Sequence, residues 1–343
     1  MKKILVILLM TLLLISCQKT SSNNNLNNNN VNNDNNTEKP PVVVEEEPEY
    51  SKFDGHLLEE DETEDKRIFA VMFDNSKAAR WQAGLSKASI VYEIRVESNI
   101  TRYLGIFTTN EDVTVGPVRS ARPYFVQTVA EYGATYAHFG GSTEGMDKIS
   151  QLNISSINGL THDGTVYYRT SHKIAPHNAY TSLHTLNERA NDFDYPSTNT
   201  FNGFSFYPTA QSLGGNPATQ VTIDYGSNPT RYEYDESTQL YHRYKDSILH
   251  LDETTEEPLE VSNIIIQHVS TAIAPNNVHK ILGNVGNGTG YLVSHGEVIE
   301  ITWSKDSETA STIFLDMDGN PITLNAGQTW IQWIEESAFI EFE

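Results

Sequence analysis

The stretch Ile68-Phe69-Ala70-Val71-Met72-Phe73-Asp74-Asn75 sets six apolar residues in a row before a turn-forming pair. An uninterrupted apolar run of this length is typical of a strand that is buried on both faces. We expect further strands over 89–96, 100–107 and 135–139, and helices over 123–132, 144–152 and 182–189. Because strands alternate with helices, residues 67–210 are predicted to form an α+β or α/β layered domain with a mixed sheet.

The chain after residue 210 has a different pattern. The sequence Gly214-Gly215-Asn216-Pro217 marks a break, and strand-like segments separated by turns such as Asp318-Gly319-Asn320 then follow one another. These segments show no strong helical period. Residues 211–343 are therefore predicted to form a mostly β domain, built as a sandwich or an open roll.

The N-terminus has the pattern of a bacterial lipoprotein signal. Lys2 and Lys3 precede an apolar stretch over 4–15, and Cys17 follows directly after Ser16. This order predicts a signal peptide over 1–16, with Cys17 as the lipidated first residue of the mature chain. We therefore expect the protein on the extracytoplasmic face of a bacterial cell membrane, held there through Cys17.

Residues 17–66 are expected to be a disordered tether between the lipid and the folded domains. Asn fills 11 of the 14 positions over 23–36, and acidic runs follow at 45–47 and 59–65. Such a segment has few apolar residues to offset the entropy of ordering.

Charge is spread unevenly along this acidic chain, whose net charge is -22. Residues 67–210 carry 12 basic and 12 acidic side chains, whereas residues 211–343 carry 5 and 20. The acidic balance argues against a nucleic-acid partner, because phosphate contacts need clustered Lys and Arg. If any part of the protein binds an anion, the arginine-rich segment over 80–122 is the one expected to do so.

Within that segment, Gly116-Pro117-Val118-Arg119-Ser120-Ala121-Arg122-Pro123 places two arginines just before the predicted helix. Guanidinium groups bind phosphate or carboxylate with two parallel hydrogen bonds, so the cluster predicts an oxyanion-binding loop. The alternative is a pair of structural salt bridges, with Glu93 and Glu97 as partners. Both interpretations stay open at this point.

Polar residues are also expected where two buried strands end. Asp74 follows the first strand, and His138-Phe139-Gly140-Gly141-Ser142 ends a later one. Ligands of α/β sheets gather beyond the carboxyl ends of strands, and a carboxylate there suits Mg²⁺. The alternatives are an ordinary turn at Asp74 and a tight turn with a satisfied histidine at His138. His172 and His177 lie five apart across a proline, a spacing that does not fit a zinc site on one helix face.

Several of these motifs together resemble the YerB-like bacterial lipoproteins. The resemblance spans about 67–340 and is carried by Asp74-Asn75, Gln82-Ala83-Gly84-Leu85-Ser86-Lys87-Ala88, Ile90-Val91-Tyr92-Glu93, Ile100-Thr101-Arg102, the 116–123 cluster and the 138–142 motif. It implies an N-terminal domain of unknown function followed by a β-rich C-terminal domain. The chain has Glu97-Ser98-Asn99 where the family usually has Glu-Gly-Gly.

The order of these motifs also resembles the LytR-CpsA-Psr phosphotransferases, which attach glycopolymers to peptidoglycan from polyprenyl-pyrophosphate carriers. That resemblance implies phosphate contacts by Arg119, Arg122 and Arg169, and a Mg²⁺ ligand in Asp74. The chain departs from the pattern at Leu85-Ser86-Lys87, where those enzymes carry Arg-Ser-Asp.

Three functions follow as hypotheses: an envelope lipoprotein that binds an anionic cell-wall or lipid-linked ligand, a glycopolymer phosphotransferase, and a structural adaptor without a ligand. The first two depend on a ligand site, for which the predicted residues are Arg102, Arg119, Arg122, Arg169, His138, Gly140 and Gly141. Asp74 is the predicted metal residue, and Mg²⁺ is the one cofactor to consider. A protein partner is expected, if anywhere, at the β-rich domain.

Overall fold

The apolar stretch before Asn75 forms β1 (Phe69–Asp74), and every residue of this strand is buried. In the computed structural model, β1 pairs antiparallel with β3 (Thr101–Phe107) and parallel with β5 (Thr135–His138). A strand that is enclosed between neighbours and covered on both faces requires apolar residues at successive positions. The structure describes residues 49–59, 62–97, 100–226, 229–275 and 279–343.

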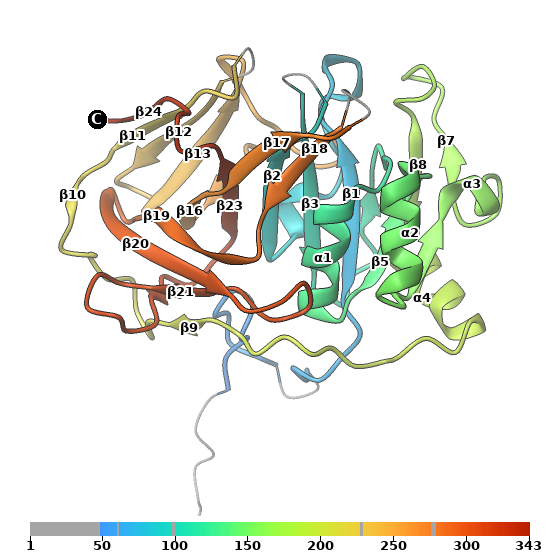
Figure 1. The fold of residues 1–343 in the computed structure, drawn as a ribbon, viewed down its shortest axis with the longest axis horizontal. Coiled ribbons are helices and arrows are strands. Elements are labelled where there is room, and N and C mark those ends of the chain that lie inside the picture. Colours follow the sequence, from blue (N-terminus) through green and yellow to red (C-terminus); the bar gives the residue numbers. More distant parts are fainter. Residues whose placement is uncertain (1–48, 60–61, 98–99, 227–228, 276–278) are drawn as a thin grey trace, which may run out of the picture. The chain divides into compact units, whose positions relative to one another are not determined.

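The main sheet runs through both predicted domains (Figure 1). Its strand order is β10-β20-β19-β16-β23-β2-β3-β1-β5-β6, with β21 paired to β20. The remaining members are β2 (Ile90–Arg95), β6 (Ser156–Asn158), β10 (Asn216–Pro217), β16 (Asn263–His268), β19 (Gly286–Ser294), β20 (Glu297–Lys305), β21 (Ile313–Leu315) and β23 (Thr329–Ile334). The late strand β23 lies between β2 and β16, so residues 47–343 form one compact unit.

Seven strands of this sheet share one direction, since β20, like β16, runs antiparallel to β19. β1 and β2 are both antiparallel to β3, while β5, β6, β23 and β16 join them through parallel pairings. The carboxyl ends of β1, β2, β5, β6, β16, β20 and β23 therefore lie along one edge of the sheet. We call this edge the carboxyl edge, and ligands of α/β sheets characteristically bind there.

A second, antiparallel sheet covers part of one face of the main sheet. Its strands are β11 (Gln220–Ile223), β12 (Thr230–Asp235), β13 (Leu240–Lys245), β14 (Ile248–Leu249), β15 (Glu260–Val261) and β24 (Ile340–Phe342). Buried and partly exposed residues alternate along β13, as expected for a sheet with one face in the core. The mostly β character predicted for residues 211–343 is thus confirmed.

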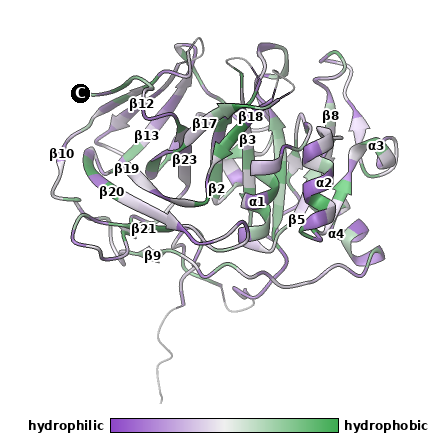
Figure 2. Cartoon of the chain, viewed as in Figure 1, coloured by the Kyte–Doolittle hydropathy of each residue, from purple (hydrophilic) through white to green (hydrophobic). Residues whose placement is uncertain are grey.

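Helices cover the opposite face at the other end of the sheet. α1 (Pro123–Tyr132) and α2 (Thr143–Gln151) contribute side chains to the same apolar cluster as β1 and β3, and Figure 1 shows α1 over these strands with α2 beside it near β5. α1 begins at its proline and stops at Gly133, whose φ of 61° suits glycine. Figure 2 shows hydrophobic colouring along the central strands and mixed colouring on α2. The helices and mixed sheet confirm the fold class predicted for residues 67–210.

Smaller elements complete the described structure. They are α3 (Gly159–His162), α4 (Leu183–Asp192), η1 (Lys77–Ala79), η2 (Leu85–Lys87), β4 (Thr114–Val115), β7 (Tyr168–Arg169), β8 (Ala179–Ser182), β9 (Ser205–Phe206), β17 (Ser270–Ile273), β18 (Lys280–Gly283) and β22 (Thr323–Leu324). No helix in the described part of the chain has the length and apolar character needed to cross a membrane.

The predicted tether is corrected at its C-terminal end. Residues 49–59, which we call the N-terminal strap, pack against the body of the protein instead of remaining disordered to residue 66. Phe53 is 1% exposed and stacks on Phe201 with ring centroids 5.1 Å apart. The buried ring of Phe53 packs this segment onto the body, although its acidic composition predicts disorder. The signal peptide, Cys17 and the Asn-rich segment lie outside the described residues.

Candidate functional site

Loop 116–122 brings the predicted arginines onto the carboxyl edge. The backbone N–H of Arg119 donates to Met72 O at the end of β1, and Phe139 after β5 donates to Arg119 O, each at 2.9 Å. The loop also donates from Ala121 N to Gly140 O at 2.9 Å. It is therefore hydrogen-bonded across the ends of two parallel strands.

Asp74 forms the first of two ion clusters at this edge. Its Oδ2 lies 3.1 Å from Arg119 Nε and 2.7 Å from His177 Nδ1, and its Oδ1 accepts from Ser76 N at 2.9 Å. Burial would raise the pKa of Asp74, but the Ser76 N–H, His177 and Arg119 outweigh burial and lower it. The carboxylate is thus held ionised by groups of the chain itself.

Among the described residues, Asp74, the predicted metal residue, has no cluster of metal-ligating side chains around it. Within the described ranges, no group of three or more His, Cys, Asp or Glu side chains is placed to hold a metal ion. His172 and His177, the two histidines of the 170s loop, contact different acids, Glu253 and Asp74. Asp74 instead holds the Arg119 side chain in place through their ion pair.

Glu97 forms the second cluster with Arg102 and Arg122. Arg122 Nε donates to Glu97 Oε1 at 2.6 Å, its Nη2 contacts the same oxygen, and Arg102 Nη2 lies 3.5 Å from Oε2. Each arginine also donates from Nη1 at 2.8 Å to a loop carbonyl, that of Ser120 or Ala121. Burial lowers the pKa of Arg102 to about 10, so it stays protonated at neutral pH. Both guanidinium groups serve to clamp the loop.

His138 and the two glycines are structural. His138 is fully buried, its Nδ1 donates to Gly140 O at 2.8 Å, and burial lowers its pKa to about 4. A Cβ on Gly140 would lie 2.9 Å from Leu160 Cδ1, and one on Gly141 would lie 2.9 Å from Met146 Sδ. Full burial of His138 argues against the ligand role predicted for it. Its Nε2 has no hydrogen-bond partner among the described residues, so it is not the satisfied histidine of the alternative interpretation either.

Arg169 lies on β7 beside the same loop. Its guanidinium stacks over Phe139 at 4.5 Å and contacts Asp163 Oδ2 and Asn178 Oδ1 at 3.1 and 3.0 Å. The side chain remains 34% exposed. The structure thus gathers Asp74, the four predicted arginines, His138 and both glycines in one region, although most of their polar atoms are already paired.

Sequence reasoning named Glu97 as a possible partner of the arginine pair, but it missed the partners of Asp74 and of the loop over 84–86. His177 reaches Asp74 across 103 positions, and Asp252 accepts hydrogen bonds from Gly84 N and Ser86 N at 3.1 and 3.0 Å across 168 and 166 positions. The carboxylate of Asp252 therefore lies against the loop over 84–86, the position that corresponds to the Arg-Ser-Asp motif in the resemblance to the phosphotransferases. No local pattern marks such pairs; only the clustering of arginines near acids indicated that partners exist.

Comparison with known proteins places these features in a family. Residues 55–196 match the family described as "Protein of unknown function (DUF3048) N-terminal domain", and residues 221–331 match its C-terminal domain. The chain is 32% identical over 284 residues to "Putative lipoprotein YerB" of Bacillus subtilis (strain 168), covering 82% of this chain and 85% of that protein. The crystal structure of YerB protein from Bacillus subtilis matches with a TM-score of 0.78 at 32% identity, covering 85% of this chain and 99% of that chain.

Proposed function

The chain belongs to the YerB-like family, and from this premise we propose that it is a lipoprotein of the bacterial cell envelope that binds an anionic ligand at its carboxyl edge. The relative from Bacillus subtilis is named as a lipoprotein, which supports the envelope location. The position of Cys17 after a basic and then apolar N-terminus supports anchoring through lipid on the extracytoplasmic face.

The observation that carries the binding proposal is that Arg119 is both paired with Asp74 and partly exposed to solvent. Asp74, whose side chain is 4% exposed, holds Arg119 Nε, while the Arg119 side chain is 25% exposed. Within the described residues, neither Nη of Arg119 has a polar partner. A guanidinium fixed at Nε and open at both Nη atoms is preorganised for two parallel hydrogen bonds to phosphate or carboxylate.

The other arginines support this role to different degrees. Arg169, 34% exposed, adds positive charge beside the same loop. Arg102 and Arg122 are 9% and 10% exposed and share Glu97, so an external anion would have to displace that carboxylate. The proposed contact is therefore Arg119, with Arg169 assisting and the Glu97 cluster holding the loop in place.

No catalytic step belongs to this proposal. Asp74 is ion-paired with Arg119 and His177, and the backbone N–H groups of Gly84 and Ser86 are satisfied by Asp252. No observation therefore favours the phosphotransferase alternative. A protein partner at the β-rich region stays a prediction.

Titration of the purified protein with inorganic pyrophosphate in a calorimeter tests the proposal. Arg119→Ala is expected to weaken binding at least about tenfold, because a hydrogen bond to a charged group contributes about 1.5–3 kcal/mol. Arg231→Ala is the matched control, since Arg231 is 32% exposed and paired with Glu233 at 3.0 Å on β12. Absence of binding to the unaltered protein, or equal binding by Arg119→Ala, would favour the adaptor alternative.

A further inference from the structure

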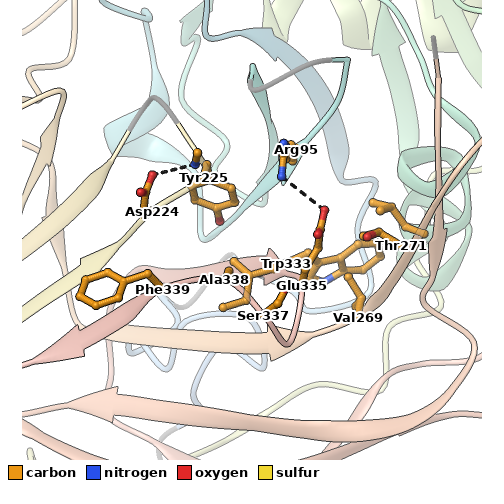
Figure 3. Close-up of a pocket in the computed structure, with 13 residues that line it drawn as sticks. Arg95, Asp224, Tyr225, Val269, Thr271, Trp333, Glu335, Ser337, Ala338 and Phe339 are labelled. Atoms are coloured by element: carbon orange, nitrogen blue, oxygen red, sulfur yellow. Dashed lines mark hydrogen bonds and ion pairs between the residues drawn. The ribbon is translucent and has the colours of Figure 1, made fainter. Parts of the chain in front are cut away.

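A hollow lies on the carboxyl edge, beyond the ends of β2, β16 and β23. It encloses about 310 Å³ and is lined by Arg95, the last residue of β2, and by Trp333, the penultimate residue of β23 (Figure 3). Its residues differ from those of the Arg119 site. A volume of this size is at the small end of the roughly 300–1,000 Å³ of ligand sites.

Aromatic rings form much of its wall. Tyr225 and Trp333 are 3% and 2% exposed, whereas Phe339 stands at the rim with 57% of its surface exposed. Val269 and Leu282 add aliphatic surface. Such a wall offers flat apolar faces to a ring-shaped ligand, and an exposed phenylalanine beside a hollow is a natural lid for one.

The charged groups at the pocket are Arg95, Asp224 and Glu335 in its lining and Lys280 beside it, two cations against two carboxylates. Glu335 lies 3.3 Å from Arg95 Nη1 and 3.2 Å from Lys280 Nζ, and Asp224 supplies a second carboxylate to the lining. A strongly charged ligand would have to break these internal ion pairs. The pocket therefore favours a ligand without net charge.

Two buried side chains nevertheless leave polar atoms without partners. Trp333 Nε1 and both amide atoms of Gln267 are enclosed and make no hydrogen bond within the described chain. Gln267 is the direct neighbour of Trp333 on the adjacent parallel strand, and the two side chains share a face of the sheet. Trp333 lines the pocket, whereas Gln267 does not. Because buried polar groups are nearly always paired, a purely apolar ligand, which would leave Trp333 Nε1 without a partner, also fits poorly here.

We propose that this pocket binds a neutral sugar ring. A pyranose has apolar C–H faces that pack on aromatic rings, while its hydroxyls both donate and accept hydrogen bonds. The hydroxyls would accept from Trp333 and donate to the carboxylates at the rim. This pocket is separate from the anion site, and its proposed ligand, an uncharged sugar, belongs to a different chemical class.

Titration with N-acetylglucosamine and its β-1,4-linked disaccharide, followed by tryptophan fluorescence and calorimetry, tests the inference. Phe339→Ala is expected to weaken binding at least tenfold, and Trp333→Phe, which keeps an aromatic ring but removes the N–H, to weaken it severalfold. Phe193→Ala, at a 39% exposed phenylalanine after α4, is the control and should bind as the unaltered protein does. Circular dichroism confirms that each variant is folded.

The outcomes separate this pocket from the anion site. Sugar binding that survives Arg119→Ala but is lost in Phe339→Ala supports the assignment. The inference is overturned if neither sugar binds the unaltered protein saturably, if Phe339→Ala binds unchanged, or if a zwitterionic amino acid such as phenylalanine displaces the sugar and binds more tightly.

Discussion

Glu93 lies at the centre of a buried charge cluster between the two sheets. Its carboxylate accepts from Arg243 Nη2 at 2.5 Å and from Lys245 Nζ at 2.8 Å, and all three side chains are 0% exposed. Burial would raise the pKa of Glu93, but Lys245 and Arg243 outweigh burial and lower it to about 2. One carboxylate thus faces two cations, and the excess cation is expected to make stability depend on pH.

Between about pH 8 and 10, the free energy of unfolding is expected to rise with pH. Burial lowers the pKa of Lys245 to about 8 despite its attraction to Glu93, from an ordinary value of 10.5. The unfolded chain therefore binds more protons than the folded one in this window, which adds up to about 1.4 kcal/mol per pH unit. Urea unfolding at a series of pH values within the window measures the slope.

Lys245→Met is expected to remove this rise, while Lys87→Met, at a 45% exposed lysine paired with Glu111, should keep it. The window closes near pH 10, because burial raises the pKa of tyrosines such as Tyr225 and their ionisation in the unfolded chain then favours unfolding. A slope that Lys245→Met leaves unchanged would contradict the argument.

At the scale of elements, the N-terminal strap belongs to the folded body. Ser89 Oγ donates to Asp54 Oδ2 at 2.5 Å, and Gly327 N donates to Asp54 O at 2.7 Å. Gly55 has a φ of 70°, and a Cβ there would lie 2.6 Å from the Phe206 ring. These contacts join the strap to β2, to the turn before β23 and to β9.

Phe53→Ala is expected to lower the free energy of unfolding by about 3 kcal/mol, because it removes a buried ring and leaves a cavity. Tyr50→Ala, at a residue of the same strap that is 47% exposed, should change it by less than about 0.5 kcal/mol. Urea unfolding followed by circular dichroism compares the two. Equal stability of both variants would show that the strap adds nothing to the body.

Local sequence signals predicted the elements well, because each signal lies within the element that it describes. The apolar run of β1, the proline that begins α1 and the glycine that ends it are examples. The polar ends of β1 and β5 were predicted in the same way, while the ligand role of the arginines beside them stays a prediction. The pairing of Arg122 with Glu97, chosen over Glu93, depends on tertiary positions, and so does the burial of His138.

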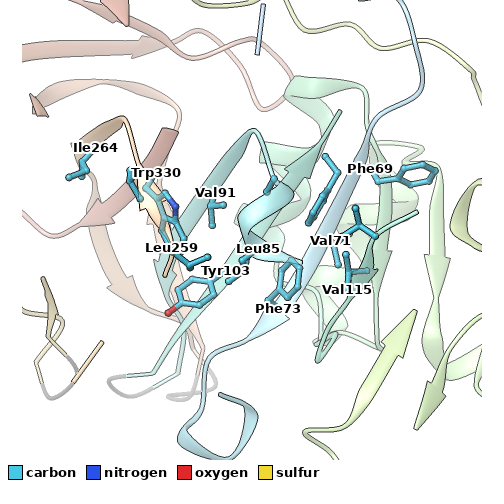
Figure 4. Close-up of a cluster of buried hydrophobic side chains, with 14 of the residues drawn as sticks. Phe69, Val71, Phe73, Leu85, Val91, Tyr103, Val115, Leu259, Ile264 and Trp330 are labelled. Atoms are coloured by element: carbon cyan, nitrogen blue, oxygen red, sulfur yellow. The ribbon is translucent and has the colours of Figure 1, made fainter. Parts of the chain in front are cut away.

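At the scale of the whole molecule, the main sheet combines strands from both sides of the composition change near residue 210. β23 pairs with β2 although about 240 residues separate them, for example Tyr92 with Ile331. The apolar core between the sheets mixes Val91 and Tyr103 with Leu259, Ile264 and Trp330 (Figure 4). The composition of the chain changes near residue 210, but strand pairing across that point cannot be recognised from the local sequence.

The continuous sheet predicts that the two halves cannot fold separately. A fragment over 49–210 would lose the β23 partner of β2 and leave Glu93 without Arg243 and Lys245. Breaking such a buried ion pair costs about 3–5 kcal/mol, a large part of the roughly 5–15 kcal/mol by which proteins are stable. The intact chain should therefore unfold in a single transition, with near- and far-ultraviolet circular dichroism coinciding. Neither fragment 49–210 nor fragment 211–343 should show a cooperative transition alone, whereas mixing the two should restore one. A dispersed amide spectrum from fragment 49–210 by itself would show that the shared sheet is dispensable.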